Sequence, residues 1–117
     1  MYKFLILGLA LFSVAAMAAD ITGTWNAAVE TDAGSGTPTF VFKQTGEQLT
    51  GTYSGALGEA KLTGAVKGNT ATWSFEANAG GDNVKVVYTG TMEGDNKMKG
   101  TIDFGSLGKG TFTATKK

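Results

Sequence analysis

From residue 21 to its end, the chain alternates apolar and polar residues with a period of two. That period places successive side chains on opposite faces of an extended chain, so it predicts β-strands rather than helices. Turns rich in Gly, Asn and Asp separate the alternating runs, as at residues 67–69 and 93–96. The runs predict eight strands, at residues 21–29, 39–44, 48–54, 59–67, 70–77, 84–92, 97–104 and 109–115.

Each predicted strand has one apolar face and one face rich in Thr and Lys. The apolar positions are Trp25, Phe40, Phe42, Leu49, Tyr53, Leu62, Val66, Trp73, Phe75, Val86, Tyr88, Ile102, Phe104 and Phe112. Every aromatic residue after position 20 is in this set. Random placement would put about half of the aromatic residues on each face, so we expect the apolar face to be the interior.

A five-residue phrase recurs along the chain: apolar, Thr or Lys, Gly, Thr or Ala, apolar. Its copies are at residues 21–25, 49–53, 62–66, 88–92, 98–102 and 108–112, the last with Gly in the first place. The glycine lies on the apolar face, where it relieves crowding and lets a strand bend sharply. Short links between strands favour pairing of neighbours. A two-sheet sandwich is the alternative, but the interior glycines favour an all-β, eight-stranded antiparallel up-and-down barrel.

The first 19 residues have the pattern of a signal peptide. Lys3 provides the positive start, an apolar run follows, and Ala16-Met17-Ala18 matches a cleavage site. The run is too short to span a bilayer. We therefore expect residues 1–19 to be a signal peptide, residues 20–117 to be a single barrel domain, and the protein to be exported to the periplasm or the extracellular space.

Charge and composition exclude several classes of function. From residue 20 the sequence has nine Lys, ten Asp and Glu, and no Cys, His or Arg. A net charge near −1 gives no basic footprint for nucleic acid. The carboxylates are predicted in turns or on the outer face, so we expect neither enzymatic activity nor a metal site nor a cofactor. The Thr- and Lys-rich outer face also argues against membrane insertion, because a membrane barrel is apolar outside.

Three segments resemble the avidin and streptavidin family, in that family's order. They are Ile21–Asn26, Leu49–Ser54 and the terminal Thr111-Phe112-Thr113. The resemblance covers most of residues 20–117 and implies an eight-stranded meander barrel that binds biotin at one open end. In its repeated Leu-Thr-Gly-Thr phrases the chain is also similar to a recurrent small secreted bacterial domain. That domain ends in Gly-Thr-Phe-Thr-Ala, here Gly110–Ala114. That second resemblance implies the fold and no particular function.

The biotin pocket of the avidin family is matched at few positions. Tyr53 corresponds to the family's tyrosine that binds the ureido oxygen, Trp73 to one pocket tryptophan, and Tyr88 replaces another. The remaining polar positions are occupied by Gly55, Ala27 and Gly110. Because a site built on buried polar partners loses most of its affinity without them, the resemblance argues against tight biotin binding.

Trp25, Tyr53, Trp73 and Tyr88 are the interior residues with polar tips. A buried Trp or Tyr requires a partner for its N–H or O–H group, and a ligand, a water molecule or a backbone carbonyl can supply it. An eight-stranded barrel is just wide enough to be filled by side chains or to hold one small ligand. We therefore predict a non-enzymatic binding module whose small, mostly apolar ligand contacts these four residues. The alternative is a structural or protein-interaction domain with a filled core.

Overall fold

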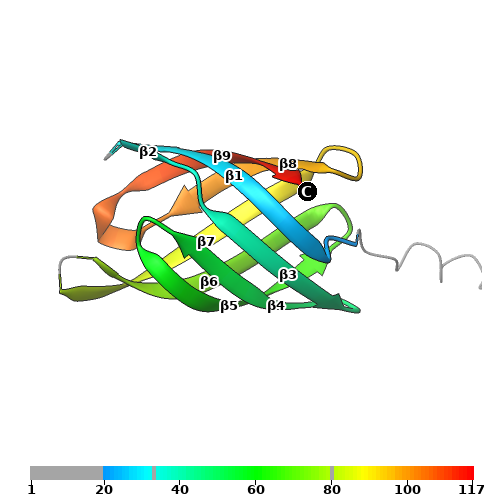
Figure 1. Ribbon diagram of the computed structural model, residues 1–117, viewed down its shortest axis with the longest axis horizontal. Helices are drawn as coiled ribbons and strands as arrows, with labels where there is room; N and C mark the ends of the chain where they lie inside the picture. Colours follow the sequence, from blue (N-terminus) through cyan, green and yellow to red (C-terminus); the bar gives the residue numbers. More distant parts are fainter. Residues whose placement is uncertain (1–19, 33, 80) are drawn as a thin grey trace, which may run out of the picture.

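The computed structural model describes residues 20–32, 34–79 and 81–117, so the signal peptide predicted at residues 1–19 lies outside the described residues. The described chain is almost entirely extended strand, joined by short turns (Figure 1). Its elements are β1 (Gly23–Thr31), β2 (Gly34–Gly36), β3 (Thr39–Thr45), β4 (Gln48–Gly55), β5 (Gly58–Lys67), β6 (Thr70–Ala79), β7 (Asp82–Met92), β8 (Lys97–Asp103), the 3₁₀ helix η2 (Gly105–Leu107) and β9 (Lys109–Lys116).

The strands form one antiparallel sheet in which sequence neighbours pair. The order from β3 to β9 is sequential, and β1 pairs with β3 on one side and with β9 on the other. The pairing of β1 with β9 covers seven residue pairs, from Trp25–Lys116 to Thr31–Gly110. This pairing closes the sheet on itself and leaves no open edge between the first and last strands. The predicted eight-stranded antiparallel up-and-down barrel is confirmed.

The short strand β2, which the sequence pattern did not reveal, is the upper part of the second barrel strand. Both β2 and β3 pair with the same side of β1, and the register continues across the gap: Val29 faces Gly36, and Asn26 faces Thr39. Pro38 lies in the gap and has no N–H to donate to the ladder. Its carbonyl still accepts a hydrogen bond from the Ala27 N–H at 2.9 Å. Proline therefore interrupts the ladder without changing the number of barrel strands.

Glycines of the recurring phrase lie opposite large side chains in the barrel interior. Gly64 pairs with Trp73, and Gly100 pairs with Phe112. A Cβ on Gly64 would overlap the Thr72 carbonyl oxygen and lie 2.7 Å from the Trp73 Cα. The glycines thus allow close approach of neighbouring strands, and the bulky residues opposite them fill the barrel centre, as the sequence indicated.

The inward face is the predicted one, with two differences of detail. Of the fourteen predicted interior residues, thirteen are buried, whereas Phe104 is only half-buried because it lies just beyond the end of β8. The first strand spans Gly23–Thr31 rather than residues 21–29. Its N-terminal neighbour Ile21 is outside the strand, yet it is fully buried.

One end of the barrel is closed by Ile21, which precedes β1 and is fully buried. The Ile21 N–H donates to Gln44 Oε1 at 2.9 Å, and the Trp25 Nε1–H donates to the Ile21 carbonyl at 2.9 Å. The C-terminus lies at the same end, where the Lys117 N–H donates to the Thr24 carbonyl at 2.8 Å. A binding site is therefore expected at the opposite end. No helix in the described part of the chain has the length and apolar character needed to cross a membrane.

Candidate functional site

A cavity of about 380 Å³ lies at the end of the barrel opposite to Ile21 and Lys117. Residues of the connections β1–β2, β4–β5 and β8–β9 contribute to its lining, together with inward side chains from the upper parts of the strands. Its walls are apolar and include Val29, Ala77, Val84, Val86 and Phe104. The rim contains exposed residues such as Leu57, so the cavity opens to solvent. The barrel is thus a cup with one closed and one open end.

Three aromatic side chains form the floor of the cup: Tyr53 of β4, Phe75 of β6 and Tyr88 of β7. The rings of Tyr53 and Phe75 are stacked, with centroids 4.2 Å apart and an interplanar angle of 18°. The Phe75 and Tyr88 centroids are 6.0 Å apart. Tyr88 rests in turn on Trp73, at a centroid distance of 5.2 Å and an angle of 13°. The floor is therefore a rigid aromatic surface supported by a second aromatic layer.

The two floor tyrosines differ in their polar contacts. The Tyr53 hydroxyl accepts a hydrogen bond from the Leu57 N–H at 3.3 Å. Tyr88 is 3% exposed, and its hydroxyl makes no hydrogen bond with any residue that the structure describes. Burial raises the pKa of the Tyr88 hydroxyl well above its usual range, and nearby Tyr53 acts in the same direction. The Tyr88 hydroxyl is therefore a neutral group at the bottom of the cavity.

The structure separates the four residues that the sequence grouped as a site. Tyr53 and Tyr88 line the cavity, whereas Trp25 and Trp73 do not. Trp25 is buried at the closed end, where the Ile21 carbonyl satisfies its N–H. Trp73 lies one layer below the floor, and its Nε1 is buried without a hydrogen-bond partner among the described residues. The two tryptophans are core residues of this barrel.

Sequence reasoning did not single out the other cavity residues. The alternation predicts that Phe75, Val86 and Phe104 face inward, but it contains no information about their distance from the barrel end. Ala77 and Val84 continue the same alternation toward the rim, so the sequence identifies them as interior positions. Ala77 lies beyond Phe75 in β6, and Val84 lies beyond Tyr88 and Val86 in β7. The missing information was depth along the barrel axis, which no single strand contains.

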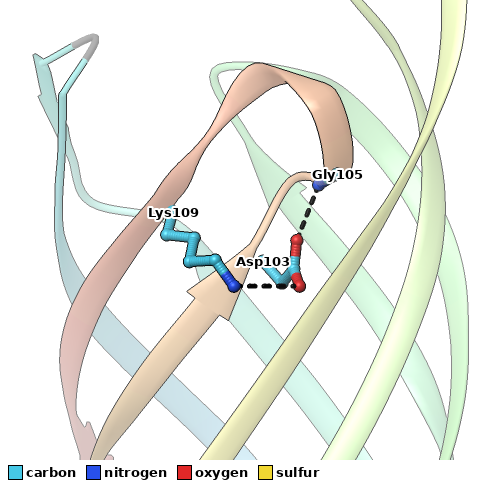
Figure 2. Close-up of polar contacts among 3 residues, drawn as sticks. All are labelled: Asp103, Gly105 and Lys109. Atoms are coloured by element: carbon cyan, nitrogen blue, oxygen red, sulfur yellow. Dashed lines mark hydrogen bonds and ion pairs between the residues drawn. The ribbon is translucent and has the colours of Figure 1, made fainter.

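A structured loop forms the part of the rim between β8 and β9. The Gly105 N–H donates to Asp103 Oδ1 at 2.7 Å, and Lys109 Nζ lies 3.7 Å from Asp103 Oδ2 (Figure 2). The Phe104 N–H donates to the Gly108 carbonyl at 2.9 Å. These bonds hold the half-buried Phe104 at the cavity wall.

The charged side chains that line the cavity lie at its rim. The charged lining residues are Asp32 and Lys109, both exposed, and no described polar or charged residue is buried. Within the described residues there is also no group of three metal-ligating side chains. The chemistry of the cavity is therefore that of an apolar chamber with an aromatic floor and two phenolic hydroxyls, which suits the binding of an apolar molecule.

Among solved structures, the chain is similar to a redesigned β-barrel. The TM-score is 0.65 at 17% sequence identity, and the match covers 83% of this chain and 90% of the redesigned barrel. At this identity the likeness shows the fold alone. No protein-family model and no curated protein matches the sequence.

Proposed function

We propose that the protein is an exported, non-enzymatic binding module that holds a small, mostly apolar molecule in the cavity at the open end of the barrel. The observation that carries this proposal is the cavity itself, which has a volume of about 380 Å³ and mainly apolar walls. Sites for small molecules are concave and mostly apolar, and typically enclose roughly 300–1,000 Å³. A barrel filled by its own side chains, as the alternative of a purely structural domain requires, would lack such a chamber.

The framework around the cavity supports binding without rearrangement. The sheet is closed by the pairing of β1 with β9, and β6 and β7, which contribute Phe75 and Tyr88 to the floor, pair with each other along their whole length from Thr70–Thr91 to Ala79–Asp82. The floor rings are fixed by stacking with each other and with Trp73. A preformed cavity requires little ordering when a ligand enters, and this lowers the free-energy cost of binding.

The avidin-like phrases are compatible with this proposal, because that family also binds a small molecule at one open barrel end. The corresponding polar positions argue against biotin itself. Tyr53 lines the cavity, but Ala27, Gly55 and Gly110 do not. The proposed ligand is therefore apolar over most of its surface rather than a molecule recognised by many hydrogen bonds.

Titration with N-phenyl-1-naphthylamine tests the proposal, because this neutral dye fluoresces strongly when it leaves water for an apolar site. The matched variants are Ala77→Phe, which places a ring in the cavity, and Ala28→Phe, which makes the same exchange on the outer face of β1. We expect saturable binding to the wild type and to Ala28→Phe, and at least ten-fold weaker binding to Ala77→Phe. Equal binding by both variants would show that the dye is not in the cavity.

Native mass spectrometry of the protein recovered from the exported fraction of its host addresses the natural ligand. The expected result is an additional mass of small-molecule size that is lost on denaturation. A protein that carries no such mass and does not bind the dye would favour a structural or protein-interaction role.

A further inference from the structure

One polar group at the bottom of the cavity has no partner in the described protein. We propose that the buried end of the bound molecule contains an uncharged hydrogen-bond acceptor, such as a ketone, ester or ether oxygen. This oxygen accepts a hydrogen bond from the Tyr88 hydroxyl on the cavity floor. This inference rests on the proposed function and adds to it the chemical class of the buried end of the ligand.

Tyr88 is the deepest cavity residue of β7. Val84 and Val86 precede it from the rim downward on the same face of the strand, whereas the next inward residues, Gly90 and Met92, do not line the cavity. A ligand that fills the cup therefore reaches Tyr88 with its leading end.

The ring of Tyr88 is held in place from several sides. Phe40 and Phe112 each contact it edge-on at a centroid distance of 5.0 Å, and Trp73 stacks against it. These contacts restrict rotation of the Tyr88 ring. Tyr88 is therefore a fixed part of the floor and borders the space that a ligand would occupy.

An acceptor on the ligand satisfies this hydroxyl better than a donor does. A tyrosine hydroxyl has one proton to donate and lone pairs that accept. If the ligand donated, the buried proton of Tyr88 would stay unpaired, and buried donors without a partner are rarer in proteins than under-used acceptors. If the ligand accepts, only a lone pair is left unused. A tyrosine hydroxyl keeps its proton at neutral pH, and burial raises the pKa of Tyr88 further in the same direction.

The acceptor is expected to be uncharged because the floor contains no cation. The cavity lining includes one cationic side chain, Lys109, which is at the rim and is directed toward Asp103 (Figure 2). A carboxylate placed against Tyr53, Phe75 and Tyr88 would lose its hydration without gaining an opposite charge, which is unfavourable. A ketone or ether oxygen loses much less hydration free energy when it is placed at the same position.

Three naphthalene derivatives of nearly equal shape test the inference by displacement of N-phenyl-1-naphthylamine. They are 2-ethylnaphthalene with no acceptor, 2-acetylnaphthalene with a neutral acceptor, and 2-naphthoate with a charged one. The protein variants are Tyr88→Phe, which removes the hydroxyl and keeps the ring, and Thr89→Val, which removes a hydroxyl from the exposed face of the same strand.

We expect Tyr88→Phe to lower the affinity for 2-acetylnaphthalene about five-fold, which is the effect of one net hydrogen bond. The affinity for 2-ethylnaphthalene should change less than about two-fold. Thr89→Val should leave the affinities for all three compounds unchanged. On the wild type, 2-naphthoate should bind at least about ten-fold more weakly than 2-acetylnaphthalene.

Each contrary result has a distinct meaning. Equal affinity of 2-acetylnaphthalene for wild type and Tyr88→Phe, or equal weakening of the ethyl compound, overturns the role of the hydroxyl. Binding of 2-naphthoate as tight as that of 2-acetylnaphthalene overturns the requirement for a neutral group. Failure of the wild type to bind the dye or any of the three compounds overturns the proposed function itself.

Discussion

Replacement of Gly64 by Ala should destabilise the barrel strongly. Gly64 lies in β5 opposite Trp73 of β6, and a methyl group there would overlap the Thr72 carbonyl oxygen and lie 2.8 Å from the Trp73 Cβ. Overpacking of side chains that can shift costs about 1–3 kcal/mol. Here the obstacles include main-chain atoms of a paired strand, so we expect a loss of about 3 kcal/mol. This is a large part of the ~5–15 kcal/mol that typically stabilises a domain.

Two matched variants isolate the steric cause. At Gly36 an added Cβ would meet nothing within 4 Å, so Gly36→Ala should change the free energy of unfolding by less than about 0.5 kcal/mol. At Gly90 the contacts are with side chains, 2.8 Å to Met98 Cγ and 2.9 Å to Phe112 Cζ. Because Met98 is flexible, Gly90→Ala should have an intermediate effect, about 1–2 kcal/mol.

Urea unfolding followed by tryptophan fluorescence measures all three variants. With a denaturant slope of about 1–3 kcal/mol/M, a loss of 3 kcal/mol lowers the midpoint by about 1–3 M. The reasoning is refuted if Gly64→Ala unfolds at the same midpoint as Gly36→Ala, because that result would mean that β5 and β6 separate without cost. A ranking in which Gly90→Ala is the most damaging would equally contradict the close backbone approach as the cause.

Three further predictions concern the closed end, the floor and the rim. Trp25→Phe removes the donor to the Ile21 carbonyl and should cost about 2–3 kcal/mol in urea unfolding while leaving the affinity for N-phenyl-1-naphthylamine unchanged; a parallel loss of dye binding would contradict the separation of the two ends. The pKa of Tyr88 is raised in the folded state, so its contribution to the free energy of unfolding is complete below the pKa of the unfolded state, near pH 10. Above that pH the contribution is lost by about 1.4 kcal/mol per pH unit. Urea unfolding between about pH 9 and pH 11 should therefore show a shallower decline for Tyr88→Phe, and identical slopes would refute this contribution. Asp103→Asn keeps an acceptor for Gly105 and breaks only an exposed ion pair, so it should cost less than about 0.5 kcal/mol, whereas Asp103→Ala should cost about 1 kcal/mol; equal losses would be the contrary result.

The strands and their faces were predictable because they depend on local alternation. Trp25, Phe40 and Trp73 are inward because they occupy one phase of a period of two, and this phase persists whatever the neighbouring strands do. Closure was also foreseeable, because glycines on the inner face are required by close strand approach in a small barrel. The continuation of the second strand above Pro38 was missed, because β2 consists of Gly and Ser and has no apolar alternation.

The position of each residue along the barrel axis was decided by the tertiary structure alone. The alternation treats Trp25, Tyr53, Trp73 and Tyr88 as equivalent, yet the first is at the closed end, the third is in the central layer, and only Tyr53 and Tyr88 reach the cavity. Depth follows from the stagger between strands, which is set by turn lengths and pairing register around the whole ring. Insertion of Ile21 into one end is likewise a contact between distant segments. The sequence by itself thus determined that the barrel has an apolar interior, and only the assembled sheet determined which end of that interior is filled and which is empty.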